Sequence, residues 1–375
     1  MTTMNYLTSI LFDDGAAKNL GAELDAANLR RPLLVADKGL VEAGVLDAVA
    51  EPVRSKIAAI FTDTPPNPTE MAARAALELY RASDCDGVVA IGGGSPIDLG
   101  KAVALASTHD GPLESYAAIN GGVARIRATV APLIAIPTTA GTGSEVGRGA
   151  LITVDSGAKL ALISPHLIPK KAICDPQLTY GLPPLLTAAT GVDALTHCFE
   201  TYLSPLVNPP AEAIALDGVA RAWSWIVRAT ENGADGKARW HMMMAALQGG
   251  LTFQKGLGAV HALSHAAGAL REPILHHGML NGVFLPHVLR FSEKHAAGKF
   301  AVLRSVLGLR AGADLARAVH DLLERLRLPT TLTQMGFDAK HIPITVTRAL
   351  HDHSNATAAL RPDAEQYAQL LKAAL

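Results

Sequence analysis

The feature that most constrains the fold is a change of pattern near residue 180. Before it, short runs that are apolar along most of their length alternate with helical patterns that begin at about Leu40, Glu70 and Pro96. These runs are RPLLVAD, KIAAIFTD, DGVVAIGGG, APLIAIPTT, ALITVD, KLALIS and KAICD. Strands without polar alternation, separated by helices, are typical of a parallel sheet covered on both faces. The first half therefore predicts an α/β domain over residues 1–180.

After about Gly181 the strand pattern disappears. Apolar residues recur at spacings of three and four in LLTAATGVDALTHCFETYL, AEAIALDGVARAWSWIV, ARWHMMMAALQGGLTF, ADLARAVHDLLERL and AEQYAQLLKAAL. This periodicity predicts an all-helical domain over residues 181–375, and the breakers in YGLPP suit a boundary. A chain of 375 residues also exceeds one ordinary core, so two domains are expected.

Composition argues against several classes of protein. The 34 acidic and 33 basic residues nearly cancel, and no basic stripe is interleaved with aromatics, so a nucleic-acid partner is not expected. Charges, Gly or Pro interrupt every apolar run before the length of a membrane span, and residues 1–15 carry no positive leader. Three cysteines without a CxxC pair suit reduced thiols. We therefore expect a soluble, cytoplasmic protein.

A glycine-rich turn, AIGGGSPIDLGK, follows one buried strand and precedes a helix. Gly92, Gly93, Gly94 and Ser95 would leave N–H groups free at the positive end of the helix dipole, which is a seat for pyrophosphate. A purely structural turn would need the same glycines. GxxxxGK[ST] fails because Ser95 and Ala102 replace its first glycine and its hydroxyl, and GxGxxG with a later acidic residue fails too. An ATPase or kinase is therefore disfavoured.

Two further segments extend this candidate cofactor site. Asp37 ends PLLVAD and could accept hydrogen bonds from an adenosine ribose, which would favour NAD over NADP by charge repulsion; alternatively it caps the next helix. The loop IPTTAGTGSEVGRGA follows another buried strand and offers Thr138, Thr139 and Thr142. Two polar loops at neighbouring strand ends favour a dinucleotide cleft.

The second half carries a metal-binding pattern. Asp193 and His197 lie four residues apart, as do His261 and His265, so each pair shares one helical face. Single histidines are more often surface or core residues, but an aspartate with several histidines on apolar helices suits a divalent metal with nitrogen and oxygen ligands. Ala262 stands where the HExxH motif has its glutamate, which argues against a metallohydrolase.

Together these motifs resemble one family. GGGSPIDLGK, PTTAGTGSE, GVDALTH, GLGAVHALSH and HGMLNGVFLPHV follow the order of the iron-containing (group III) alcohol dehydrogenases and cover nearly the whole chain. The resemblance implies a Rossmann-like N-terminal domain, a helical metal-binding and catalytic domain, and a cleft between them, in a dehydroquinate synthase-like fold. It also implies NAD, one divalent metal (Fe²⁺, alternatively Zn²⁺) and a homodimer or higher oligomer, for which the N-terminal strand is a candidate contact.

The resemblance further assigns site residues. The metal ligands that it implies are Asp193, His197, His261 and His277. The cofactor contacts that it implies are Asp37, Gly92, Gly93, Gly94, Ser95, Thr138, Thr139, Thr142 and, by a looser match, Lys159. His265, one turn beyond His261, would be catalytic, carrying a proton between the substrate oxygen and solvent. His276 receives no role.

Several segments, including RPLLVADKG, TPPNPTE and NPPAEAIALDG, are similar to the bacterial 4-hydroxybutyrate dehydrogenases of this family. Their substrates, 4-hydroxybutyrate and succinate semialdehyde, carry a carboxylate that needs a counter-charge. The cations in or beside the matching motifs are Arg148, Lys255 and Arg271, each of which could instead be a surface residue or form a scaffold ion pair. Phe253 would line the substrate pocket or pack in the core.

The expected reaction is hydride transfer between a carbinol carbon and nicotinamide, assisted by a metal that lowers the pKa of the hydroxyl. One alternative is a diol or simple-alcohol dehydrogenase. Another is a maleylacetate reductase, and only this one is disfavoured by the complete set of four metal ligands. A dehydroquinate synthase-like lyase, using NAD transiently, would give no net NADH. A non-catalytic nucleotide-binding protein would have no use for an open metal site.

Overall fold

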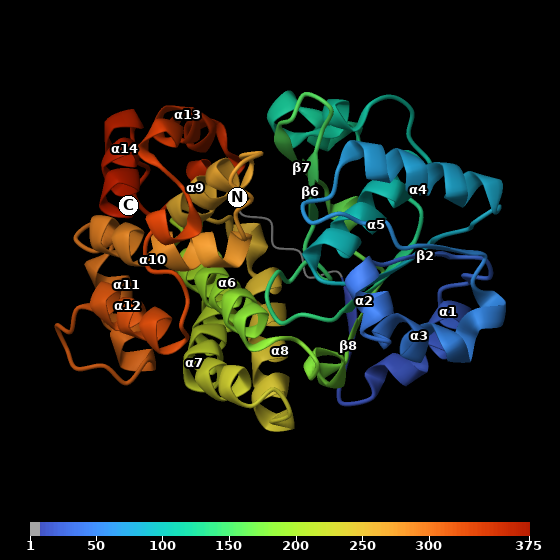
Figure 1. The fold of residues 1–375 in the computed structure, drawn as a ribbon, viewed down its shortest axis with the longest axis horizontal. Helices are drawn as coiled ribbons and strands as arrows, with labels where there is room; N and C mark the ends of the chain where they lie inside the picture. The colour runs from blue at the N-terminus through green and yellow to red at the C-terminus, as the bar shows by residue number, and fades with distance from the viewer. Residues whose placement is uncertain (1–7) are drawn as a thin grey trace. The chain divides into compact units, whose positions relative to one another are not determined.

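The computed structural model describes residues 8–375, which form two compact units. An α/β unit contains residues 8–139 and 143–181, and a helical unit contains residues 140–142 and 182–375 (Figure 1). Residues 1–7, on which the expectation about an export leader partly rests, lie outside the described residues. None of the helices between residues 8 and 375 has the length and apolar content needed to cross a membrane.

The α/β unit is built on six parallel strands in the order β1-β8-β5-β4-β2-β3, which confirms the predicted parallel sheet. Their bounds are β1 (Ser9–Phe12), β2 (Leu33–Val35), β3 (Ala59–Phe61), β4 (Val88–Gly92), β5 (Leu133–Pro137) and β8 (Lys171–Cys174). The helices of this unit are α1 (Leu20–Ala26), α2 (Lys38–Glu42), α3 (Val45–Ala50), α4 (Glu70–Ala82) and α5 (Gly94–Ala106).

The central strands are apolar throughout because both faces of the sheet are covered. Along β4, Val88 and Ala90 join one buried cluster with residues of α4 and α5. Val89 and Ile91, which point to the opposite face, join a second cluster with residues of α1 and α3. A strand buried on both sides has no position for a polar residue, which explains the unbroken apolar runs in the sequence.

Two of the predicted strands lie outside the parallel sheet. β6 (Gly149–Thr153) and β7 (Lys159–Ile163) form a separate antiparallel pair, so the prediction that they join the sheet is wrong. The connection over residues 154–158 is too short, because a parallel crossover needs about a dozen residues. In β6 buried and half-buried residues alternate, as in a strand covered mainly on one face.

The strand order places the candidate cofactor residues at a topological switch point. From β2 the chain moves outward to β3 and then returns to β4 on the other side of β2. In such sheets ligands bind beyond the carboxyl ends of the strands where the order reverses. Asp37 follows β2, Gly92 ends β4, and Thr138 follows β5, so three neighbouring strand ends carry predicted residues.

The helical unit is a bundle whose central helix is α6 (Pro184–Leu203), buried from Val192 to its end and packed against α7, α8 and α10 (Figure 1). The other helices are α7 (Pro209–Glu231), α8 (Gly236–Leu251), α9 (Ala259–Gly268), α10 (His277–Ser292), α11 (Ala297–Val306), α12 (Leu315–Arg325), α13 (Ile342–His351) and α14 (Ala364–Ala373). This confirms the predicted all-helical second half.

Candidate metal centre

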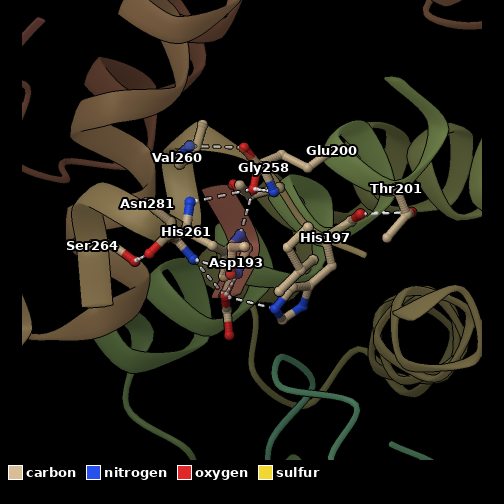
Figure 2. Close-up of polar contacts among 12 residues, drawn as sticks. Asp193, His197, Glu200, Thr201, Gly258, Val260, His261, Ser264 and Asn281 are labelled. Carbon is tan, nitrogen blue, oxygen red and sulfur yellow. Dashed lines mark hydrogen bonds and ion pairs between the residues drawn. The ribbon is translucent and has the colours of Figure 1, made fainter. Parts of the chain in front are cut away.

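Three helices of the helical unit bring four potential metal ligands together. α6 contributes Asp193 and His197, α9 contributes His261, and His277 is the first residue of α10. One donor atom from each lies within 4.8 Å of the others. Figure 2 shows the side chains of Asp193, His197 and His261 pointing toward one another. Residues far apart in sequence thus meet as a three-nitrogen, one-carboxylate set.

The carboxylate of Asp193 is the centre of this set. Its Oδ1 lies 3.4 Å from Nε2 of His197, 3.7 Å from Nε2 of His261 and 3.6 Å from Nε2 of His277. Burial raises the pKa of Asp193, but the surrounding imidazoles, His197 and His277 first, outweigh burial and hold the pKa well below its usual value. Asp193 is therefore an anion in a buried site. Three histidines surround it, and each of them faces the carboxylate with its Nε2 atom.

The other ring nitrogen of each histidine has a separate partner. Nδ1 of His261 lies 2.7 Å from the Glu200 carboxylate, Nδ1 of His197 donates to the Gly141 carbonyl at 3.2 Å, and Nδ1 of His277 lies 3.1 Å from Ser264 Oγ. Partners of this kind orient metal-binding imidazoles and leave Nε2 for the metal. The contacts around the site therefore match those of a metal centre.

Asn281 of α10 provides a test of whether a cation fits. Its amide nitrogen donates to Asp193 Oδ1 at 2.7 Å and lies 3.2 Å from Nε2 of His261 and 3.3 Å from Nε2 of His277. Its amide oxygen is buried without a hydrogen-bond partner among the described residues. A buried amide with an unpaired oxygen beside convergent Nε2 atoms fits a site shaped for a cation. Mixed nitrogen and oxygen donors suit Fe²⁺ or Zn²⁺.

Glu200 is an important site residue that the motif analysis missed. It lies on α6 almost one turn beyond His197, and its carboxylate accepts hydrogen bonds from the backbone N–H groups of Gly258, Val260 and His261 at 3.0, 2.7 and 3.2 Å. The same carboxylate meets the His261 ring, as Figure 2 shows. Burial lowers the pKa of His261, but hydrogen bonds to Asp193 and Glu200 raise it to about 9. Glu200 thus caps α9 and orients its ligand.

Replacement of Glu200 by glutamine is expected to weaken metal binding by roughly 10–100-fold, the usual cost of losing an outer-shell partner. Glutamine keeps an oxygen for the backbone N–H groups but loses the charge that favours the required His261 tautomer. Chelator competition measures the metal Kd, and circular dichroism checks the fold. Glu231→Gln, at an exposed position on α7, is the matched control. An unchanged metal Kd in folded Glu200→Gln would contradict this role.

His265 lies next to the four ligands but is turned toward a different partner. Its side chain is buried and stacks on the His277 ring, with ring centroids 5.2 Å apart. Its Nδ1 lies 3.0 Å from the carboxylate of Asp352, which follows α13 and is a second residue that the sequence analysis did not identify. His276 is outside the ligand set, and its Nδ1 is buried without a hydrogen-bond partner among the described residues.

In the α/β unit, the glycine loop has the predicted shape. Gly92 has φ of +148°, and a Cβ there would lie 2.5 Å from Pro96, so a side chain is excluded by both backbone and space. α5 begins at Gly94 without a side-chain cap, which leaves its first N–H groups available. The Thr138 amide donates to the Gly92 carbonyl at 3.0 Å, which joins the two polar loops.

The remaining cofactor candidates have mixed surroundings. Asp37 caps α2, because its Oδ1 accepts a hydrogen bond from the Leu40 amide at 3.0 Å. This is the second of the two roles predicted for Asp37. Its carboxylate is half-buried, and the other oxygen is not used by the cap. Thr139 is packed beside Gly93 in the α/β unit, whereas Thr142 belongs to the helical unit. Lys159 lies on β7 and donates to Asn67 Oδ1 at 2.8 Å.

Lys101 of α5 was not singled out from the sequence, yet it holds the hydroxyl-rich loop. It is almost fully buried and donates to the carbonyls of Ser144, Gly147 and Gly149 and to the Ser144 hydroxyl, at 2.7 to 2.9 Å. Burial lowers the pKa of Lys101 to about 8. Spacing does not reveal it, because its partners come from backbone more than forty residues later.

The predicted cations for a substrate carboxylate differ in their surroundings. Lys255 is fully buried and pairs with Glu212 at 2.6 Å, so its charge is already matched and we withdraw it as a substrate contact. Arg148 and Arg271 are exposed and form no ion pair within residues 8–375. The ring of Phe253 packs edge-on against His197, with centroids 4.8 Å apart.

Comparison with known proteins agrees with this site. Residues 8–176 match the family model "Iron-containing alcohol dehydrogenase", and residues 187–375 match "Fe-containing alcohol dehydrogenase family, C-terminal". The chain is 50% identical over 379 aligned residues, 99% of each chain, to 4-hydroxybutyrate dehydrogenase of Cupriavidus necator.

Solved structures show the same likeness. A 1,3-propanediol oxidoreductase superposes with a TM-score of 0.94 and 32% identity over 100% of both chains. Sulfoacetaldehyde reductase from Bifidobacterium kashiwanohense, solved in complex with NAD⁺, gives a TM-score of 0.90 and 26% identity over 100% of this chain and 98% of that one. The chain therefore belongs to the iron-containing alcohol dehydrogenase family and is an oxidoreductase of that metal- and NAD-dependent family.

Proposed function

We propose that this protein interconverts 4-hydroxybutyrate and succinate semialdehyde with NAD(H). The observation that supports this type of reaction is the set of four potential metal ligands, in which three histidines direct Nε2 toward the carboxylate of Asp193. The relative that is 50% identical over nearly all of both chains, named for 4-hydroxybutyrate, supports the substrate. The carboxylated substrate and the preference for NAD are the parts that go beyond family membership.

In this proposal the domain predicted over residues 1–180 binds the dinucleotide, and the helical domain predicted over residues 181–375 binds the metal. The amides of Gly92 to Ser95 would hold the pyrophosphate at the start of α5. Asp37 would accept from the ribose hydroxyls through its remaining oxygen and disfavour a 2′-phosphate. Thr138, Thr139, Thr142 and Lys159 are retained as further cofactor contacts.

Asp193, His197, His261 and His277 would hold one divalent metal, which we propose to be Fe²⁺ with Zn²⁺ as the alternative. When bound, such a metal supplies a Lewis acid that polarises an alcohol or carbonyl oxygen. Glu200, Ser264 and Gly141 keep the three imidazoles in the tautomer and orientation that binding requires. Phe253 packs edge-on against His197, and in this proposal its ring lines the substrate pocket.

His265 is proposed to move the proton that leaves or joins the substrate oxygen. Its Nδ1 contact with Asp352 fixes the ring and its tautomer, so that Nε2 is the atom available to exchange a proton. A buried histidine in contact with the ligand His277, but not one of the ligands itself, is suitably placed for this task. Arg148 and Arg271 remain candidates for pairing with the substrate carboxylate.

The test is to assay metal-loaded protein against a panel of substrates and to measure the formation or consumption of NADH by its absorbance. The panel contains 4-hydroxybutyrate, 1,3-propanediol, ethanol and, for the reverse reaction, succinate semialdehyde, each with NAD and NADP. We expect the highest kcat/KM for 4-hydroxybutyrate and succinate semialdehyde with NAD. A higher value for 1,3-propanediol would favour the diol reaction of the structural relative. No net cofactor turnover with any substrate would favour a lyase and overturn the proposal.

A further inference from the structure

A second group of potential metal ligands lies in the helical unit and shares no residue with the first. It consists of His265 on α9 and Asp352 and His353, which follow α13. One donor atom from each lies within 4.8 Å of the other two, the same criterion that the first set meets. The side chain of His265 is 5% exposed, that of Asp352 13% and that of His353 34%, so the group runs from the interior to solvent.

The spacing of the donor atoms suits a small divalent ion. Nδ1 of His265 lies 3.0 Å from Asp352 Oδ2, and Nδ1 of His353 lies 3.6 Å from Asp352 Oδ1. Ligand atoms on a tetrahedral zinc ion, with bonds of about 2.0–2.1 Å, are roughly 3.3 Å apart. In the first set the corresponding nitrogen–carboxylate distances are 3.4 to 3.7 Å. Both sets therefore have similar spacing.

The second group is also partly organised in advance. Asp352 Oδ1 accepts from the Ser354 amide at 2.8 Å, which orients the carboxylate at the start of the 3₁₀ helix His353–Thr357. The His265 and His353 rings stack at an interplanar angle of 18° with centroids 5.6 Å apart, and both Nδ1 atoms face Asp352. Two imidazoles and one carboxylate are borderline ligands that favour Zn²⁺ over Mg²⁺ or Ca²⁺.

We propose that His265, Asp352 and His353 form a second, solvent-accessible site for Zn²⁺, and that zinc bound there inhibits the enzyme. A metal on Nδ1 of His265 takes the place of the proton that this nitrogen donates to Asp352; the neutral ring then carries its proton on Nε2, which can no longer accept one from the substrate. His265 is then held as a ligand and no longer serves as a proton carrier. Inhibition rests on the proposed function of His265, whereas binding of the second ion does not.

Zinc binding is tested by counting metal ions. Protein carrying one equivalent of Zn²⁺ is dialysed against increasing free Zn²⁺, and bound metal is measured by elemental analysis. We expect a second equivalent in the native protein. In His353→Ala its Kd should rise at least about tenfold, the lower end of the cost of losing even an outer-shell partner, while the first equivalent stays. His351→Ala is the matched control, because His351 is exposed and its Nδ1 contacts the Thr347 carbonyl on the same helix.

Turnover provides the second measurement. Excess Zn²⁺ should inhibit the native enzyme and His351→Ala, but not His353→Ala, whose activity without added zinc should match the native value. A single equivalent in the native protein, or a second equivalent kept by His353→Ala, overturns the site. Full zinc binding without inhibition overturns the regulatory part. If the substrate panel showed no dehydrogenase activity, the metal count would still decide the site, so the two proposals fail separately.

Discussion

Asp193→Asn is expected to abolish stable metal binding and to lower kcat/KM by at least about 10³-fold. The carboxylate is the anion shared by all three Nε2 atoms, and asparagine removes its charge while keeping its shape. Lewis-acid stabilisation by a metal is worth several kcal/mol, and each 1.36 kcal/mol corresponds to about a tenfold change in rate. Elemental analysis of the purified variant and NADH absorbance measure the two effects.

The matched control for this variant is Asp217→Asn. Asp217 is a half-exposed aspartate on α7 that pairs with Arg221 at 2.6 Å and takes no part in the ligand set. It should keep one equivalent of metal and near-native turnover. If folded Asp193→Asn kept both metal and activity, the four-residue site would be refuted. Loss of metal with unchanged turnover would instead refute metal-assisted chemistry.

His265→Ala is expected to keep its metal but to lose about 10²–10⁴-fold in kcat, the range for removal of a general acid–base group. The metal should remain because none of the four proposed ligands is altered. The pH profile of kcat is the decisive measurement, because a purely structural defect would lower turnover without removing the limb that reports proton transfer. Native-like turnover across the pH range would exclude His265 as the proton carrier.

Asp352→Asn separates positioning from proton transfer. Asparagine can still contact Nδ1 of His265 but no longer favours the tautomer with a proton there, so kcat should fall less than in His265→Ala, with little change in KM. The control is His351→Ala, which should behave like the native enzyme. His351 is next to Asp352 in the sequence, but its Nδ1 contacts the Thr347 carbonyl and not His265. Equal losses in Asp352→Asn and His351→Ala would remove the positioning role.

The spacing of residues in the sequence predicted which members of the candidate site share a helix. Asp193 and His197 are on one helix, and so are His261 and His265, because a spacing of four residues places side chains on one helical face. His277 was selected over His276 by resemblance to a family. In the structure His277 begins α10 and presents Nε2 to Asp193, whereas His276 precedes the helix and stays outside the set.

The partners of these residues escaped prediction because they come from distant parts of the chain. Glu200 reaches the start of α9 from α6, sixty-one residues before His261, and Asp352 meets His265 across eighty-seven residues. Lys255 is predicted as a cation for a substrate carboxylate, but in the fold it is buried and paired with the half-buried Glu212. Charge alone is readable from a sequence, but whether a charge is already paired depends on packing.

The sequence by itself determined the two architectures and the types of chemistry. Apolar runs predicted strands buried on both faces, and apolar residues spaced by three and four predicted helices. The glycine-rich turn was also readable, because Gly92 has a backbone conformation that excludes a side chain. Only the tertiary structure decided which strands pair, since the short connection between β6 and β7 separates them from the parallel sheet. It also decided which imidazoles share one carboxylate and which face another, because three-dimensional packing, not sequence distance, sets those contacts.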